Sequence, residues 1–402
     1  MKPLSYRHTV TASCLGSVTM SVTNNLPPLL FVIFHEDLGV PFGQITLLIT
    51  LNFLLQLTVD LLAALFADRV GYRPLLIASA ALSSVGLGAL ATLPRHTTPF
   101  LGLLIADVLY ALGSGLGEAI ISPTVEACPM KNKAGMMGFL HSFYCWGTVA
   151  VILLSTAFLA LVGEGHWWLL PLLWMLLPAA NTVLFCLVPI PELERAEKGG
   201  EERAGGSLLH RPLFWLFLFL MTMAGAAELS MNQWASAFAE VGLGVTKTVG
   251  DLVGPCLFAL LMGVTRLVFA FSKRLNLVLF LLFSSGFAVG AFLLASLADD
   301  PVLSLIGCAL TGLGVGALWP GLLSLAADRF PGGGTLLFSL CALFGDLGCS
   351  LGPTLVGLVA EGGTLAGGLS LAAAFPAVLF AGLLFLTLAK KKKNVDEKFE
   401  KM

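Results

Sequence analysis

The sequence predicts an all-α membrane protein of twelve transmembrane helices, arranged in two pseudo-symmetric six-helix bundles. Of its 402 residues, 57% are hydrophobic and only 11% are charged, whereas about 25% of the residues of a typical soluble domain are charged. Twelve apolar runs reach the length of about 20 residues that crosses a bilayer. One polar segment separates the first six runs from the last six. Composition, run length and the central interruption together predict this fold class.

The predicted helices are apolar runs bounded by charged residues, Pro or Gly. They span residues 9–34, 43–67, 73–94, 99–124, 136–162, 167–190, 211–238, 249–272, 275–297, 301–325, 335–360 and 365–389. The first run is too long, and too polar at Thr23, Asn24 and Asn25, for a cleaved signal peptide. We therefore expect it to remain in the mature chain.

The polar segment after the sixth run is rich in Glu, Lys and Gly and has no apolar face, which is typical of a surface linker. It sets the predicted domain boundaries. These are an N-terminal bundle at 1–190, a cytoplasmic linker at 191–210, a C-terminal bundle at 211–389 and a basic cytoplasmic tail at 390–402.

The two halves also resemble each other in sequence. Gly113 and Gly115 lead to a proline in the fourth run, and a glycine series from Gly312 to Gly316 leads to Pro320 in the tenth. Duplicated halves of this kind are typical of transporters that rock about a site near the bilayer midplane. The repeat therefore predicts a binding site between the halves.

Lys and Arg are distributed very unevenly among the predicted loops. If the N-terminus is cytoplasmic, 19 of the 22 Lys and Arg residues lie on the cytoplasmic side. Cytoplasmic loops of membrane proteins carry an excess of these residues. We therefore predict that both termini are cytoplasmic and that the protein is a multi-pass protein of a bacterial inner membrane.

Several function classes are excluded or disfavoured. The net charge of −2 offers no basic surface for nucleic acid. The eight cysteines show no CxxC or metal-ligand spacing. The sequence has no G-x-S-x-G, H-E-x-x-H or phosphate-binding loop. We expect no enzyme activity, no metal, no cofactor and no ATP-driven transport, and we expect a monomer.

Ionisable residues inside the apolar runs are energetically costly and usually functional. Glu118 lies within the fourth run, behind glycines on alternate positions, and Asp346 lies near the middle of the eleventh. A carboxylate is poorly solvated in a medium of low dielectric constant, so both are predicted to take up and release a coupling proton. The alternative is a permanent hydrogen bond to a neighbouring helix. Asp60 and Asp107 are weaker candidates without a nominated partner.

The loop between the second and third runs reads Ala-Leu-Phe-Ala-Asp-Arg-Val-Gly-Tyr-Arg over residues 64–73. It resembles the G-x-x-x-D-R-x-G-R-R signature of the major facilitator superfamily, with Ala64 in place of the first Gly. The resemblance implies the fold of that superfamily. It also implies that Asp68, Arg69 and Arg73 belong to a cytoplasmic gating loop whose contacts break as the halves rock.

Within that superfamily the chain resembles the fucose permease-like group of sugar and proton symporters. The similar stretches are Asn24-Asn25-Leu26, Glu118 followed by Pro123, the segment from Glu228 to Trp234, and the tenth run around Trp319-Pro320. This chain has Pro27-Pro28 where that group carries an acid after N-N-L. The resemblance implies a sugar as substrate and a proton as coupling ion.

Amide side chains are suited to recognising hydroxyl groups, and the flat face of Trp is suited to a sugar ring. The predicted substrate-binding residues are Asn24, Asn25, Gln56, Glu228, Asn232, Gln233, Trp234 and Trp319. Arg266 and His141 lie at similar depths in the eighth and fifth runs, which face each other in the superfamily. They are predicted to form an interhelical pair.

The predicted function is secondary active transport by alternating access, with proton-coupled uptake of a sugar or similar small polar solute. The partners are this solute, protons and the lipid bilayer. An exporter of amphipathic compounds or drugs is the alternative, favoured by the missing first-helix acid and by the Phe, Leu and Met content. A transporter-like receptor is disfavoured because the linker and tail are too short for a signalling domain.

Overall fold

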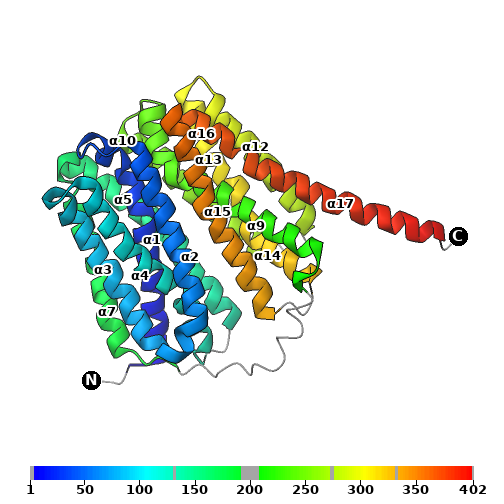
Figure 1. Cartoon of the computed structure of the whole chain (residues 1–402), viewed down its shortest axis with the longest axis horizontal. Coiled ribbons are helices and arrows are strands. Elements are labelled where there is room, and N and C mark those ends of the chain that lie inside the picture. Colours follow the sequence, from blue (N-terminus) through cyan, green and yellow to red (C-terminus); the bar gives the residue numbers. More distant parts are fainter. Residues whose placement is uncertain (1–3, 130–132, 192–207, 272–275, 331–333, 401–402) are drawn as a thin grey trace. The chain divides into compact units, whose positions relative to one another are not determined.

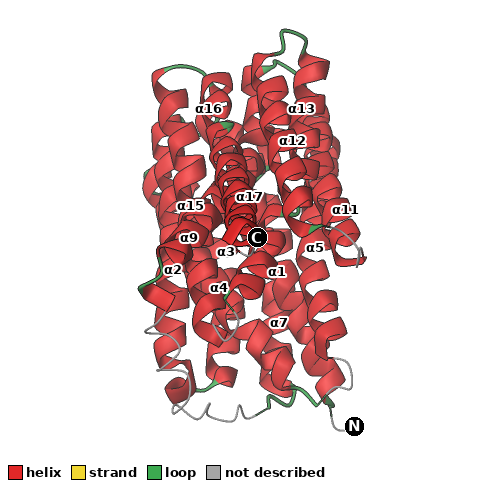
Figure 2. Cartoon of the chain, turned by 90° about the vertical axis from the view of Figure 1, so that its right-hand side faces the viewer, coloured by secondary structure: helices red, strands yellow, loops and turns green. Residues whose placement is uncertain are grey.

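The structure is a computed structural model of the chain, and it describes residues 4–129, 133–191, 208–271, 276–330 and 334–400. The regular structure of these residues is helical, with short loops between the helices (Figure 2). Twelve spans of the described residues are long and apolar enough to cross a membrane. They overlap the twelve predicted runs, so the predicted all-helical fold is confirmed.

The chain divides into two compact units. Unit 1 comprises residues 1–196 and 233–256, and unit 2 comprises residues 197–232 and 257–402. The division therefore falls within the seventh and eighth spans. The predicted linker 191–210 lies largely outside the described residues, as do the side chains of the predicted tail.

Unit 1 contains the first six spans and the hairpin that connects the seventh and eighth spans (Figure 1). Its elements are α1 (Tyr6–Glu36), α2 (Phe42–Val70), α3 (Tyr72–His96), α4 (Pro99–Ala127), α5 (Lys133–Val162), η1 (Glu164–His166), α6 (Leu169–Trp174), α7 (Leu176–Leu187), the end of α9 (Pro212–Ala237), η2 (Phe238–Gly242), α10 (Lys247–Asp251) and η3 (Leu252–Cys256). Two of these, η2 and η3, are single turns of π-helix. Such turns often occur at functional sites.

Unit 2 contains most of α9 and the remaining spans. Its further elements are α11 (Leu257–Phe271), α12 (Leu277–Leu297), α13 (Pro301–Val315), α14 (Leu318–Arg329), α15 (Gly334–Gly362), α16 (Leu365–Ala372) and α17 (Ala374–Glu400). The tenth span is broken between α13 and α14, at Gly316 and Ala317. Broken spans expose main-chain groups inside a bundle.

Close backbone contact through glycine holds α3 against α4 in unit 1. A Cβ atom at Gly86 would lie 2.6 Å from the Tyr110 amide nitrogen, and one at Gly113 would lie 2.6 Å from the Ser83 amide nitrogen. The Ser79 hydroxyl donates to the Gly113 carbonyl at 2.7 Å. Without a hydrophobic driving force between helices in lipid, small residues and interhelical hydrogen bonds supply the attraction.

Unit 2 has the same kind of close backbone contact through glycine. A Cβ atom at Gly314 of α13 would lie 2.7 Å from the Ala288 Cα atom of α12. On the other side of the unit, Gly225 of α9 lies against the backbone of Gly345 of α15, and Gly348 lies against the Thr222 carbonyl. The corresponding pairs α3–α4 and α12–α13 therefore use the same kind of contact in the two halves.

The contact at Gly86 generates a stability prediction. Gly86→Ala places a methyl group against the main chain of α4, and overpacking of this kind costs about 1–3 kcal/mol. We expect a lower midpoint of thermal unfolding in detergent, measured with a thiol-reactive dye. Gly290→Ala in α12 is the matched control, because a Cβ atom there has no neighbour within 4 Å. Equal midpoints for the two variants would contradict this account.

Candidate functional site

A chain of hydrogen-bonded polar side chains crosses three helices of unit 1. Asn52 Nδ2 of α2 donates to Asp107 Oδ1 of α4 at 3.0 Å. Gln56 Nε2 donates to Asn24 Oδ1 of α1 at 3.2 Å and also to Asn52 Oδ1. Asn52, Gln56 and Asp107 are buried. Burial of polar groups is tolerated when they are hydrogen-bonded, and here the bonds join α1, α2 and α4.

The seventh span contributes Gln233 to this chain. Gln233 Nε2 donates to the Asn24 main-chain carbonyl at 3.2 Å. That carbonyl lies four residues before Pro28, which has no amide hydrogen to donate within α1. Pro27 and Pro28, which are both inside α1, therefore free two helix carbonyls, those of Thr23 and Asn24. One of the two becomes the acceptor for Gln233.

Four of these residues, Asn24, Asn52, Asp107 and Gln233, line a pocket in unit 1. The polar lining is formed by Thr23, Asn24, Asn52, Asp107, Tyr110 and Gln233, and the apolar lining by Pro27, Pro28, Phe31, Phe34, Leu48, Ile49, Phe53, Leu90 and Leu103. A few polar groups among apolar and aromatic walls are typical of small-molecule sites. The arrangement is suited to a solute with both hydrogen-bonding groups and an apolar face.

Three of the predicted substrate residues, Asn24, Gln56 and Gln233, belong to this chain of hydrogen bonds. Asn25 points elsewhere: its Nδ2 donates to the Ser21 carbonyl at 2.9 Å and to Thr148 Oγ1 of α5 at 3.4 Å. It thereby joins α1 to α5, which lie side by side in Figure 1.

Trp234 is fully buried, and its ring packs against aromatic side chains of α1 and α2. The ring centroids of Phe31 and Phe42 lie 5.8 Å and 6.3 Å from it. Phe31 lines the pocket, whereas Trp234 does not. Trp234 therefore lies behind the pocket wall and fixes the position of Phe31.

Glu118 lies on the same face of α4 as Asp107. The two residues are eleven positions apart, which is about three helical turns or about 16 Å along the axis. Glu118 is exposed, whereas Asp107 is buried. The predicted proton carrier thus lies on the face of α4 that also carries the pocket residue Asp107.

In unit 2 the predicted residue Glu228 forms an ion pair with Arg266. Arg266 Nη2 lies 2.7 Å from Glu228 Oε1, and Arg266 Nε donates to the Gly316 carbonyl at 3.3 Å. Gly316 lies at the break of the tenth span. Arg266 therefore joins α9 and α11 to the main chain exposed by that break. The side chain of His141, its predicted partner, lies outside the described residues.

The other predicted residues of unit 2 lie on α9, α14 and α15. The Trp319 ring lies against Gly345, where a Cβ atom would overlap it. Asp346 follows directly along α15, and both Asp346 and Asn232 are partly buried. Trp319 and the predicted proton carrier Asp346 are therefore brought to the same level of unit 2.

The sequence matches the family model of the Major Facilitator Superfamily over residues 12–353. The chain belongs to this superfamily. It is therefore an integral multi-pass membrane protein and a secondary transporter, in a family without enzymatic activity. A family of this kind implies a small-molecule substrate.

Two curated relatives match at low identity. Membrane protein MosC of Rhizobium meliloti is 24% identical over 306 residues, which cover 75% of this chain and 71% of MosC. An uncharacterized MFS-type transporter of Yersinia pestis is 24% identical over 344 residues, which cover 83% of this chain and 82% of that protein. Both matches extend over most of each protein.

Solved major facilitator structures show the same fold. The nucleoside transporter NupG has a TM-score of 0.78 at 12% identity, and the match covers 94% of this chain and 99% of NupG. A bacterial homolog of the lysosomal transporter Spinster has a TM-score of 0.74 at 14% identity, with coverage of 96% and 97%. The E. coli fucose:proton symporter FucP has a TM-score of 0.64 at 16% identity, with coverage of 94% and 98%. FucP is one structural neighbour among several, so the resemblance to the fucose permease group is not specifically supported.

The major facilitator loop after α2 places Arg73 against the end of α7. Its guanidinium donates to the carbonyls of Phe185, Cys186 and Val188 at 3.1, 3.0 and 2.9 Å. The last carbonyls of a helix lack intrahelical partners and carry partial negative charge. Arg73 therefore caps the sixth span.

The other two predicted gating residues are less constrained. The Arg69 guanidinium lies 5.9 Å from the centre of the Phe66 ring, and Arg69 is exposed. The Asp68 side chain lies outside the described residues. Of the three gating predictions, Arg73 therefore has the most defined contacts.

Two pocket residues were missed or ranked low by reasoning from the sequence. Asn52 was not singled out, although it lies four positions before Gln56 and hence on the same face of α2. Asp107 was given no partner, because Asn52 is 55 residues away in the chain. The available signal was the pair Asn52 and Gln56, since two amides on one face of an apolar helix require polar neighbours.

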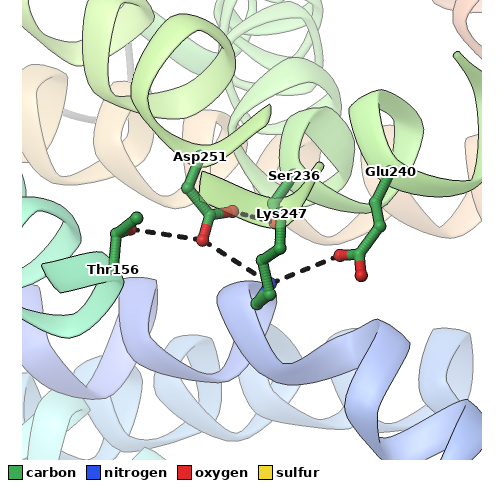
Figure 3. A network of polar contacts seen from close by, with 5 residues as sticks. All are labelled: Thr156, Ser236, Glu240, Lys247 and Asp251. Atoms are coloured by element: carbon green, nitrogen blue, oxygen red, sulfur yellow. Dashed lines mark hydrogen bonds and ion pairs between the residues drawn. The ribbon is translucent and has the colours of Figure 1, made fainter. Parts of the chain in front are cut away.

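A second polar cluster in unit 1 surrounds Lys247 (Figure 3). Its Nζ atom lies 3.4 Å from Glu240 Oε2 and 3.5 Å from Asp251 Oδ2. Asp251 also accepts hydrogen bonds from Thr156 Oγ1 of α5 at 3.2 Å and from Ser236 Oγ. Lys247 and Asp251 are only 6% and 1% exposed. The cluster therefore fastens the hairpin of the seventh and eighth spans to α5.

Removing one partner of a buried ion pair is strongly destabilising, by about 3–5 kcal/mol, because it leaves an uncompensated charge. We therefore expect Lys247→Met to lower the midpoint of thermal unfolding markedly. Adding Asp251→Asn removes one of the two carboxylates that Lys247→Met leaves without a cation. The amide side chain of Asn can still form hydrogen bonds with Thr156 and Ser236. The double variant should regain part of the loss in the same assay. A double variant less stable than Lys247→Met would refute this reading.

Proposed function

We propose that the protein takes up a sugar or a similar small polar solute by alternating access, with protons as the coupling ion. The observation that carries this proposal is the chain of hydrogen bonds from Gln233 through Asn24, Gln56 and Asn52 to Asp107 at the pocket. Neutral amides offer donors and acceptors without fixing a charge. They are suited to the hydroxyl groups of such a solute.

Glu118 and Asp346 are the proposed proton carriers. Glu118 lies on the face of α4 that also carries the pocket residue Asp107, about three turns away. Moving one charge across 100 mV is worth about 2.3 kcal/mol. A proton bound outside and released inside therefore supplies enough free energy for substantial accumulation of the solute.

The choice of a sugar as the solute is supported by similarity to known transporters. Asn24-Asn25-Leu26 and the segment from Glu228 to Trp234 resemble the fucose permease-like group. FucP itself is described as a fucose:proton symporter. NupG, described as a nucleoside transporter, also has the same fold, and a nucleoside likewise presents a polar ring. A polar ring with hydroxyl groups is common to both.

Export of amphipathic compounds or drugs is the second candidate. It is favoured by the apolar pocket wall, to which α1 contributes Pro27, Pro28, Phe31 and Phe34. It is also favoured by the absence of an acid after Asn24-Asn25-Leu26. Such a substrate would use the aromatic wall more than the amides.

Counterflow in proteoliposomes tests the proposal against this candidate. Purified full-length protein is preloaded with an unlabelled solute and supplied outside with the same solute in radiolabelled form. We expect counterflow of a monosaccharide, and we expect Gln56→Leu to abolish it, because the substitution breaks the chain of amides between α1 and α2. Counterflow restricted to hydrophobic drugs would instead support the exporter. A protein that moves no solute at all would contradict transport.

Proton coupling through Glu118 has its own test. Glu118→Gln keeps the shape of the side chain but cannot release a proton. We expect it to abolish accumulation driven by a pH gradient while exchange at equal concentrations continues, with both measured in the same proteoliposomes. Glu361→Gln, at an exposed position near the end of α15, is the control. Normal accumulation by Glu118→Gln would remove Glu118 from the coupling mechanism.

A further inference from the structure

Asp107 has an unused hydrogen-bonding atom inside the pocket. The residue is only 2% exposed, lines the pocket and accepts one hydrogen bond at Oδ1 from Asn52. Its Oδ2 atom has no partner in hydrogen-bonding geometry among the described residues, and the Tyr110 hydroxyl lies nearby. Leaving a buried acceptor unpaired costs about 1–3 kcal/mol, and more for a charged group. The unpaired atom therefore marks a place where a bound group would be stabilised.

The surroundings of Asp107 provide no positive charge. Among the described residues that line the pocket, Tyr110 is the other titratable side chain, and none is Lys, Arg or His. The charged groups of the neighbouring helices, including His35 of α1, Asp60 of α2 and Arg95 of α3, do not line it. A buried charge requires a partner. The partner of an ionised Asp107 must therefore come from the ligand.

One branch of the polar chain runs toward Asp107, while Gln56 also donates to Asn24. Gln56 donates to Asn52, and Asn52 donates to the carboxyl group. Asp107 is consequently the final acceptor of this branch, and the missing contact at Oδ2 is a donor. Phe31, Phe34 and Tyr110 line the same pocket, and aromatic faces attract cations. The free acceptor atom of Asp107, the lack of a positively charged side chain and the aromatic wall of the pocket all favour a cationic donor.

We propose that Asp107 binds a protonated amino group of the transported solute, so that the substrate is a polar amine. This inference rests on the proposed function, because it names the charged group carried by the proposed solute. The amino group donates to Oδ2 and supplies the positive charge that the pocket lacks, while Asn24 and Gln233 remain available for its hydroxyl or carbonyl groups. A neutral sugar would leave no buried charge uncompensated only if the carboxyl group were protonated.

The same geometry separates the substrate from the coupling proton. The amine and a proton compete for one carboxyl group, so the amine should bind less tightly as the pH falls. A proton that travels in the same direction as the amine must then occupy a different acid. Glu118, three turns along the same face of α4, is such an acid.

Isothermal titration calorimetry on the purified full-length protein tests this assignment with matched probes. Glucosamine is compared with glucose, and 2-phenylethylamine with 2-phenylethanol. We expect at least one amine to bind at least tenfold more tightly than its neutral counterpart, and less tightly at lower pH. Asp107→Asn should weaken its binding by about 10- to 100-fold, the loss expected for a hydrogen bond to a charged group, and should remove the pH dependence.

Two further variants keep the test decisive if Asp107→Asn folds poorly. Asp107→Glu keeps the charge and should retain preferential binding of the amine, and Asp299→Asn, at an exposed position, should bind like the unmodified protein. The assignment is overturned if neither amine binds, if the neutral probes bind as tightly, or if Asp107→Asn binds the amine unchanged. Counterflow of a neutral sugar that survives Asp107→Asn would overturn it too, while leaving the proposed transport function intact.

Discussion

Where a bilayer excludes water, each polar group of a span must find a partner within the protein or on a bound ligand. This constraint explains the main polar contacts of both units. The Arg266 guanidinium is satisfied by Glu228 and by the Gly316 carbonyl. Lys247 lies between two carboxylates. Between α3 and α4, Gly86 and Gly113 bring the backbones close together, and there the Ser79 hydroxyl donates to the Gly113 carbonyl. At that contact, helix packing and polar satisfaction depend on the same small residues.

Much of the fold was predictable from the sequence, because each span appears in it as a long apolar run. The twelve spans follow from this signal, and the central polar segment separates the two sets of six. A break within a span has no comparable signal in the sequence. The turn between α13 and α14 lies inside an uninterrupted apolar run, and its carbonyl is satisfied by an arginine 50 residues away. Only the tertiary structure brings them together.

The candidate site was predictable in its residue types but not in its pairings. Asn24, Gln56 and Gln233 were identified as amides in apolar runs, and they meet in unit 1. The role of Asp107 depends on contacts between α2 and α4, which no local pattern specifies. The fucose permease group carries an acid on the first helix, where this chain has two prolines. In this pocket the carboxyl group comes from α4, and the two prolines line the same pocket.

Those two prolines also affect the mechanics of α1. A helix resists bending because each turn is tied to the next by hydrogen bonds, and Pro27 and Pro28 remove two successive ties. The first helix is consequently most compliant at the depth of the pocket. A solute that binds the Thr23 carbonyl or the Asn24 side chain therefore acts on the part of α1 that bends most easily. Binding there can tilt one half of α1 relative to the other.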